Sequence, residues 1–152
     1  MKSIIYSLVV FGLFFGGIFS AHAADEKVRF AKFEKDMSGV KLLGQFTIDG
    51  GGKQAKEEYT ILKVKKLPAK DLWLFTARVK YGKTDLTLPM PIPVKWAGDT
   101  PVISMDKLKI PLLGTFSAQV VLDGNRYAGT WQHGKVGGHL FGSIEKVEKE
   151  KK

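Results

Sequence analysis

The sequence predicts an all-β domain, an antiparallel β-barrel or curled β-sandwich of about eight strands, with one short N-terminal helix. Two observations lead to this prediction. From Val40 onward, apolar and polar residues alternate with a period of two, which places one set of side chains on a buried face. Glycine-rich turns separate the alternating runs at short intervals, which is typical of antiparallel barrels and sandwiches.

Residues 1–23 have the three parts of a cleaved secretory signal peptide. Lys2 supplies a positive charge, residues 4–19 form an apolar run, and the Ala-His-Ala of 21–23 puts small residues before a cut at Ala24. The alternative is an uncleaved membrane anchor, but the run is shorter than the roughly 20 residues that cross a bilayer. We therefore expect a secreted or periplasmic protein with no transmembrane segment after cleavage.

The composition excludes several classes of site. The chain has no cysteine, which rules out disulfides, thiolate metal sites and cysteine nucleophiles. The formal net charge is +9, and all basic residues but Arg29, Arg78 and Arg126 are lysines. Proteins that recognise nucleic acids depend on arginine for bidentate contacts to bases and phosphates, so we expect no nucleic-acid partner. A lysine-rich surface is typical of a protein surface that is simply exposed to solvent. The alternative is that its positive charge attracts an anionic polymer or lipid of the cell envelope.

The rest of the chain divides into three parts. Residues 24–38 form an N-terminal segment with a possible short helix, which Gly39 would end. Residues 39–147 form the antiparallel β domain, and residues 148–152 form a charged, disordered tail. Helical spacing places three apolar residues of the first part on one face: Phe30, Phe33 and Met37.

Alternation and turn residues define the expected strands. They cover about residues 40–48, 57–67, 72–81, 86–96, 102–105, 116–122, 127–132 and 140–147. In the third strand one face carries Trp73, Phe75, Ala77, Val79 and Tyr81; in the fourth it carries Leu86, Leu88, Met90, Ile92, Val94 and Trp96.

The fourth expected strand contains Pro89, Pro91 and Pro93. Prolines at every second position remove the backbone N–H donors from one edge of a strand only. This pattern predicts a protected edge strand and argues against a fully closed, regularly hydrogen-bonded barrel at this position. A polyproline-like segment laid over the core is the alternative.

The two histidines of the β domain raise the question of a metal site. If His133 pairs directly with His139, both share a face and could bind zinc or copper. A register one residue away, with Trp131 opposite Gly142, covers glycines with large residues and separates the histidines onto opposite faces. We favour the second register and expect no metal site.

No motif indicates catalysis or a cofactor. Asp85, Asp99, Asp106 and Asp123 all lie in or beside turns, where aspartate is favoured for its local hydrogen bonds. There is no Gly-x-Ser-x-Gly elbow, and the Gly50–Gly52 run lacks the helix that follows a phosphate-binding loop. We therefore expect neither catalytic residues nor cofactors.

Five aromatic residues on the apolar faces are the candidate ligand-binding residues. Their ordinary role is core packing, but a sheet that curls enough would turn them into the lining of a pocket for an apolar ligand. These residues are Trp73, Phe75, Trp96, Tyr127 and Trp131.

Two resemblances accompany these patterns. The Gly-x-Trp at 129–131, with a short helix before up-and-down strands, resembles the lipocalin and avidin class of barrels, although lipocalins carry that tripeptide at their first strand. The stretches 72–78, 93–102 and 127–134 resemble small secreted proteins of environmental bacteria. That group has no known activity, so the resemblance implies no functional residues.

The function hypothesis is an exported, non-enzymatic binding protein that holds a small apolar or amphipathic ligand inside the β domain. One alternative is a structural or surface-interacting envelope protein that binds anionic polymer or lipid through its lysines. A hydrolase with an unrecognised site is the other. An interior cavity of several hundred cubic ångströms would favour the first hypothesis.

Overall fold

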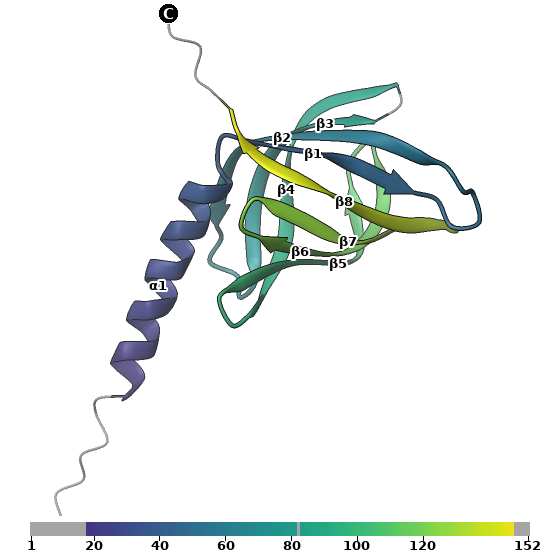
Figure 1. The fold of residues 1–152 in the computed structure, drawn as a ribbon. Coiled ribbons are helices and arrows are strands. Elements are labelled where there is room, and N and C mark those ends of the chain that lie inside the picture. Colours follow the sequence, from purple (N-terminus) through teal and green to yellow (C-terminus); the bar gives the residue numbers. More distant parts are fainter. Residues whose placement is uncertain (1–17, 82, 148–152) are drawn as a thin grey trace, which may run out of the picture.

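The protein is a closed barrel of eight antiparallel strands that follow one another in chain order, with a helix at one end (Figure 1). A computed structural model describes residues 18–81 and 83–147. The elements are α1 (Ile18–Met37), β1 (Val40–Thr47), β2 (Gln54–Lys66), β3 (Leu72–Tyr81), β4 (Thr84–Ala97), β5 (Thr100–Ile110), β6 (Gly114–Asp123), β7 (Arg126–His133) and β8 (Val136–Lys146). The predicted fold class is thus confirmed, and β8 pairs with β1 to complete the ring. Residues 1–17 of the predicted signal peptide and the predicted tail at 148–152 lie outside the described residues.

The period-two alternation places the interior residues as predicted. Along residues 73–79 and 88–94, every second side chain is buried and those between them are partly or fully exposed, because a strand turns successive side chains to opposite faces. Leu86 and Trp96 of the same predicted face are partly buried, and the side chain of Tyr81 lies outside the described part of the structure. The buried set of these two strands is Trp73, Phe75, Ala77, Val79, Leu88, Met90, Ile92 and Val94.

The fifth strand is longer than predicted. β5 continues to Ile110 instead of ending at Met105, because its pairing with β6 resumes at Leu108 after a β-bulge between Met105 and Leu108. Lys107 in the bulge has a positive φ of 47°. At the bulge, successive interior residues, Met105 and Leu108, are three positions apart instead of two. A search for alternation with a period of two therefore does not detect that the strand continues.

Both predicted registers for β7 and β8 are wrong. Trp131 lies opposite Gly138, and Tyr127 lies opposite Gly142. The connection between the strands is a two-residue turn, shorter than the gap between the expected strands 127–132 and 140–147, and Gly134 in that turn adopts a φ of 61°. The observed register differs from the favoured one by an even number of residues. Each side chain therefore still points to the face predicted for it, and the two histidines lie on opposite faces of the sheet.

The proline-containing strand is not an edge strand, because β4 pairs with β3 and β5. Its pairing with β5 is nevertheless restricted to residues 94–97; in the described ladders, residues 86–93 pair with β3 alone. The N–H of Val94 points to the β3 side, where it reaches the carbonyl of Asp71 at 2.8 Å. Since N–H directions alternate along a strand, the positions of this stretch that would donate to β5 are 87, 89, 91 and 93, and all but Thr87 are proline.

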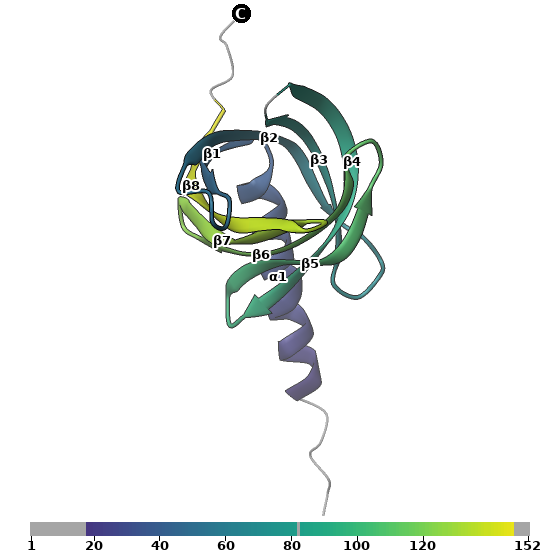
Figure 2. The same cartoon turned by 90° about the vertical axis from the view of Figure 1, so that its right-hand side faces the viewer.

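Helix α1 covers one end of the barrel, and Figure 2 looks along the barrel with α1 behind the ring of strands. The predicted apolar face is confirmed: Phe33 and Met37 are buried, and Phe30 packs against the core. The ring of Phe33 lies 4.8 Å from that of Trp73 and 5.5 Å from that of Trp96, both edge-on. In the described residues, no helix is both long and apolar enough to span a bilayer.

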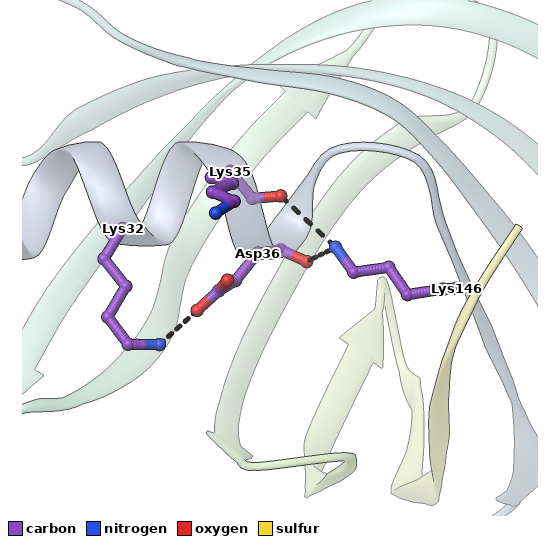
Figure 3. A network of polar contacts seen from close by, with 4 residues as sticks. All are labelled: Lys32, Lys35, Asp36 and Lys146. Carbon is purple, nitrogen blue, oxygen red and sulfur yellow. Dashed lines mark hydrogen bonds and ion pairs between the residues drawn. The ribbon is translucent and has the colours of Figure 1, made fainter.

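Polar contacts fix the end of α1 that meets the barrel. The ammonium of Lys146, in β8, donates to the carbonyl oxygens of Lys35 and Asp36 at 3.2 and 2.8 Å (Figure 3). These carbonyls belong to the last turn of the helix, where intrahelical partners are missing and a cation is favoured. Glu34 accepts from the backbone N–H of Lys66 in β2 at 2.6 Å. The helix is therefore attached to two strands as well as to the aromatic core.

Candidate ligand-binding cavity

The barrel interior contains a cavity of about 400 Å³. Met37 of α1 lines it at the covered end, while His133 and Val136, both exposed to solvent, line it at the opposite end. The cavity is therefore closed by the helix on one side and reaches the surface on the other, the end that faces the viewer in Figure 2. Most lining residues are apolar, among them Leu42, Ile61, Met90, Ile92, Ile110, Leu113, Val120 and Leu140.

The structure separates the five candidate aromatic residues into two groups. Phe75, Tyr127 and Trp131 line the cavity. Trp73 and Trp96 instead lie beneath α1, with their ring centres 6.4 Å apart, and they are not part of the cavity lining. This separation follows from their positions along the strands, because both tryptophans lie near the barrel end that the helix covers.

A buried carboxylate, Glu57 of β2, lies in the cavity wall with 5% of its surface exposed. The hydroxyl of Tyr127 donates to Oε1 of Glu57, and the hydroxyl of Tyr59 donates to its Oε2, each at 2.8 Å. Each carboxylate oxygen thus has one donor and retains capacity for another. The described ion pairs do not include Glu57.

Burial determines the electrostatics of this group. Desolvation raises the pKa of Glu57 above its ordinary value, and the two tyrosine hydrogen bonds partly oppose that effect. Burial, the hydrogen bond to Glu57 and its charge all raise the pKa of the Tyr127 hydroxyl. Tyr127 therefore stays protonated at physiological pH and serves as a donor.

Two glycines make the contact between Tyr127 and Glu57 possible. The strand registers place Tyr127, Gly142, Gly44 and Glu57 opposite one another in sequence across β7, β8, β1 and β2. A Cβ atom on Gly44 would lie 2.3 Å from the Tyr127 hydroxyl oxygen, and one on Gly142 would lie 2.2 Å from the carbonyl oxygen of Leu43. Gly44 thus leaves room for the Tyr127 hydroxyl, and Gly142 allows β8 and β1 to approach closely.

Glu57 was missed by the sequence analysis, which considered only aspartates in turns. The available signal was the alternation of Glu57, Tyr59 and Ile61, which share one face of β2. Glu58 directly follows Glu57, so the sequence alone does not identify which of the two carboxylates faces inward.

The other candidate polar residues lie apart from the carboxylate. His133 stacks on Phe116 with ring centres 4.2 Å apart, and His139 is exposed on the outer face. Asp85 accepts two hydrogen bonds from Arg78, which hold the pKa of Asp85 below its ordinary value. Within residues 18–81 and 83–147, no three His, Asp or Glu side chains are grouped so that they could hold a metal ion.

Comparisons with protein-family models, curated proteins and solved structures find no match to this chain. Its function is therefore inferred from the cavity itself.

Proposed function

We propose that this protein binds a small apolar or amphipathic ligand in the interior of its barrel. The observation that supports the proposal is the cavity of about 400 Å³ with its largely apolar lining. Ligand pockets in proteins commonly measure about 300–1,000 Å³ and combine apolar walls with a few placed polar groups. Glu57, Tyr59 and Tyr127 supply such polar groups, so the cavity suits a ligand with an apolar body and one polar end.

Filling the cavity tests this proposal. Ala118 is buried in β6 and lines the cavity, so Ala118→Phe places a ring inside it. We expect decanol, titrated by calorimetry and followed by tryptophan fluorescence, to bind the wild-type protein and not the variant.

Ala128→Phe is the matched control, because Ala128 is exposed on β7 and lies outside the cavity lining. This control should bind decanol like the wild type. Equal binding by both variants would place the ligand outside the barrel and overturn the proposal, as would a wild-type protein that takes up no decyl compound.

The open end of the barrel supports a second candidate function, attachment to an anionic lipid bilayer. Because the strands run alternately up and down, the connections β1–β2, β5–β6 and β7–β8 lie at this end together with the adjoining ends of β3 and β4. The three named connections each present an exposed apolar side chain: Ile48, Leu112 and Val136. Leu112 is 87% exposed at a positive φ of 67°, a conformation unfavourable for a bulky residue and not explained by packing within the chain.

Charge at the same end favours a bilayer as the occupant. Lys53, Lys109 and Lys135 are exposed in or beside these connections, where Asp49 is an opposing charge. Apolar tips among lysines suit insertion between anionic headgroups, since each basic residue near such a surface adds about 1 kcal/mol of attraction. Val136 belongs both to this end and to the cavity lining, so the lining reaches the surface that would face the bilayer.

Vesicle sedimentation tests the attachment. We expect the protein to pellet with phosphatidylglycerol-containing vesicles, less so as salt rises, and not with pure phosphatidylcholine vesicles. Leu112→Ser should weaken pelleting, whereas Leu62→Ser, an exposed leucine at the bulge of β2, should not. Equal loss in both variants, or equal pelleting with both vesicle types, would contradict the attachment.

We also propose that the chain is exported after loss of residues 1–23. The described side-chain contacts between α1 and the barrel all come from Arg29 and later residues, so cleavage before Ala24 removes none of them. Mass spectrometry of the protein from periplasmic and culture fractions should find Ala24 as the first residue. An intact N-terminus in the cytoplasm alone would contradict export.

A further inference from the structure

We propose that the polar end of the ligand is a protonated amine and that Glu57 binds it. This inference rests on the proposed ligand-binding function and adds the chemical class of the ligand. It starts from the charge of Glu57, for which the described cavity lining holds no lysine or arginine. Glu57 lies in the cavity wall, almost wholly removed from solvent, and the hydrogen bonds described for its carboxylate come from neutral hydroxyl donors.

A carboxylate in such a place is costly unless a cation accompanies it. Buried charged groups in proteins are paired, bind a metal or give up their charge. The described lysines and arginines that form ion pairs are on the outer surface: Arg29, Lys32, Lys41 and Arg78. None of them lines the cavity. The chain itself therefore supplies no cation to Glu57 within the described residues.

The geometry around Glu57 fits an ammonium group. Its two oxygens each accept one tyrosine hydroxyl, which fixes the carboxylate and leaves the remaining lone pairs for a donor from the cavity. An ammonium offers three donors and no acceptor, so it matches an acceptor-only group. A ligand carboxylate would bring a second negative charge to the site, and an alcohol would leave the charge unbalanced.

The other polar groups of the lining do not compete for this role. Ser117 accepts a hydrogen bond from the backbone N–H of Lys107 at 2.9 Å, and His133 stacks on Phe116 at the open end. Glu57 is the carboxylate of the described lining, and apolar side chains surround the space in front of it. A ligand with an alkyl body would place its amine at Glu57 and its tail among these side chains.

The test compares decylamine, decanol and decanoate on the wild-type protein by titration calorimetry at neutral pH. The three share one alkyl chain and differ in the charge of the polar end. We expect decylamine to bind about ten- to a hundredfold more tightly than decanol, as expected for a hydrogen bond between charged groups in place of a neutral one. Decanoate should bind most weakly.

Two variants, each of which removes one carboxylate charge, test whether Glu57 causes the preference for the amine. Glu57→Gln should reduce the affinity for decylamine by about ten- to a hundredfold and so remove the preference for the amine over decanol. Glu58→Gln is the matched control: Glu58 is the next residue, pairs with Lys41 on the outer face at 3.4 Å and should preserve the preference for the amine.

The outcomes separate the inference from the function on which it rests. If none of the decyl compounds binds the wild type, the proposed function fails. If decanol binds and decylamine is not preferred, or if the preference persists in Glu57→Gln, the amine assignment fails while the binding function stands. The wild-type comparison decides the question even if Glu57→Gln does not fold.

Discussion

The hydroxyl of Tyr127 donates a hydrogen bond to Glu57 over the backbones of two intervening strands. The side chain starts on β7, passes Gly142 of β8 and Gly44 of β1, and ends at a carboxylate of β2. The first and last of these residues are 70 positions apart in sequence, so the contact joins β2 to β7 across the pairing of β1 with β8 that closes the barrel. It links closure of the fold to the polar part of the cavity.

Removing the Tyr127 hydroxyl should destabilise the folded protein. Tyr127→Phe leaves Oε1 of a buried carboxylate without its donor, which costs on the order of 1–3 kcal/mol. Urea unfolding at neutral pH measures this loss. The same substitution in a Glu57→Leu background should cost clearly less, because no acceptor then remains. An equal cost in both backgrounds would show that the hydroxyl does not act through Glu57.

Glu57 should make stability depend on pH in an unusual direction for a carboxylate. Its pKa is raised above 4.5 in the folded protein, so above that pH the folded state binds more protons than the unfolded state. The contribution of Glu57 to stability is fully present below pH 4.5 and is lost as the pH rises through the folded pKa. Unfolding free energies of wild type and Glu57→Gln between pH 4 and 8 should therefore diverge in favour of the variant. A constant difference, or one of opposite sign, would contradict the raised pKa.

A methyl group at Gly142 should disturb the barrel wall strongly. Its Cβ would lie 2.2 Å from the carbonyl oxygen of Leu43 and 2.6 Å from the Cα of Gly44, so backbone must move. We expect Gly142→Ala to cost about 3 kcal/mol or more in urea unfolding. Gly124→Ala is the comparison: no atom lies within 4 Å of its Cβ and its φ is 59°, so only backbone strain of about 1–2 kcal/mol applies. A smaller loss at Gly142 than at Gly124 would refute this explanation.

The attachment of α1 should depend on Phe33. Its ring is buried against Trp73 and Trp96, and Phe33→Ala should cost about 3–5 kcal/mol in unfolding free energy. The tryptophan emission should also shift to the red as water reaches the two rings. Lys27→Ala, an exposed substitution on the same helix, should change neither quantity. Unchanged emission in Phe33→Ala would mean that the helix does not shield these tryptophans.

The sequence predicted the features that depend on local periodicity. Trp73 and Phe75 faced inward as expected because a strand alternates its faces, and Phe33 and Met37 met the barrel because helical spacing put them on one side. Features that depend on pairing between strands were not predictable. The bulge at Lys107 lengthened β5 without a sequence signal, and a two-residue turn at Gly134 set a register that neither prediction anticipated.

The position of Glu57 shows the same limit. Placing its carboxylate beside Tyr127 requires the registers of three successive ladders, none of which adjacent residues specify. The cavity likewise depends on closure of the whole ring. Candidate aromatic residues could be chosen from the apolar faces, but their division between the helix-covered end and the cavity depended on the position of α1.

The prolines of β4 also determine how the barrel wall can deform. Where a ladder joins two strands, widening the barrel breaks hydrogen bonds, but residues 86–93 share no ladder with β5. Separation of the two strands there is opposed mainly by packing of the core cluster that includes Met90, Ile92 and Ile110. The backbone therefore resists widening of the barrel less along residues 86–93 than where interstrand hydrogen bonds span the wall.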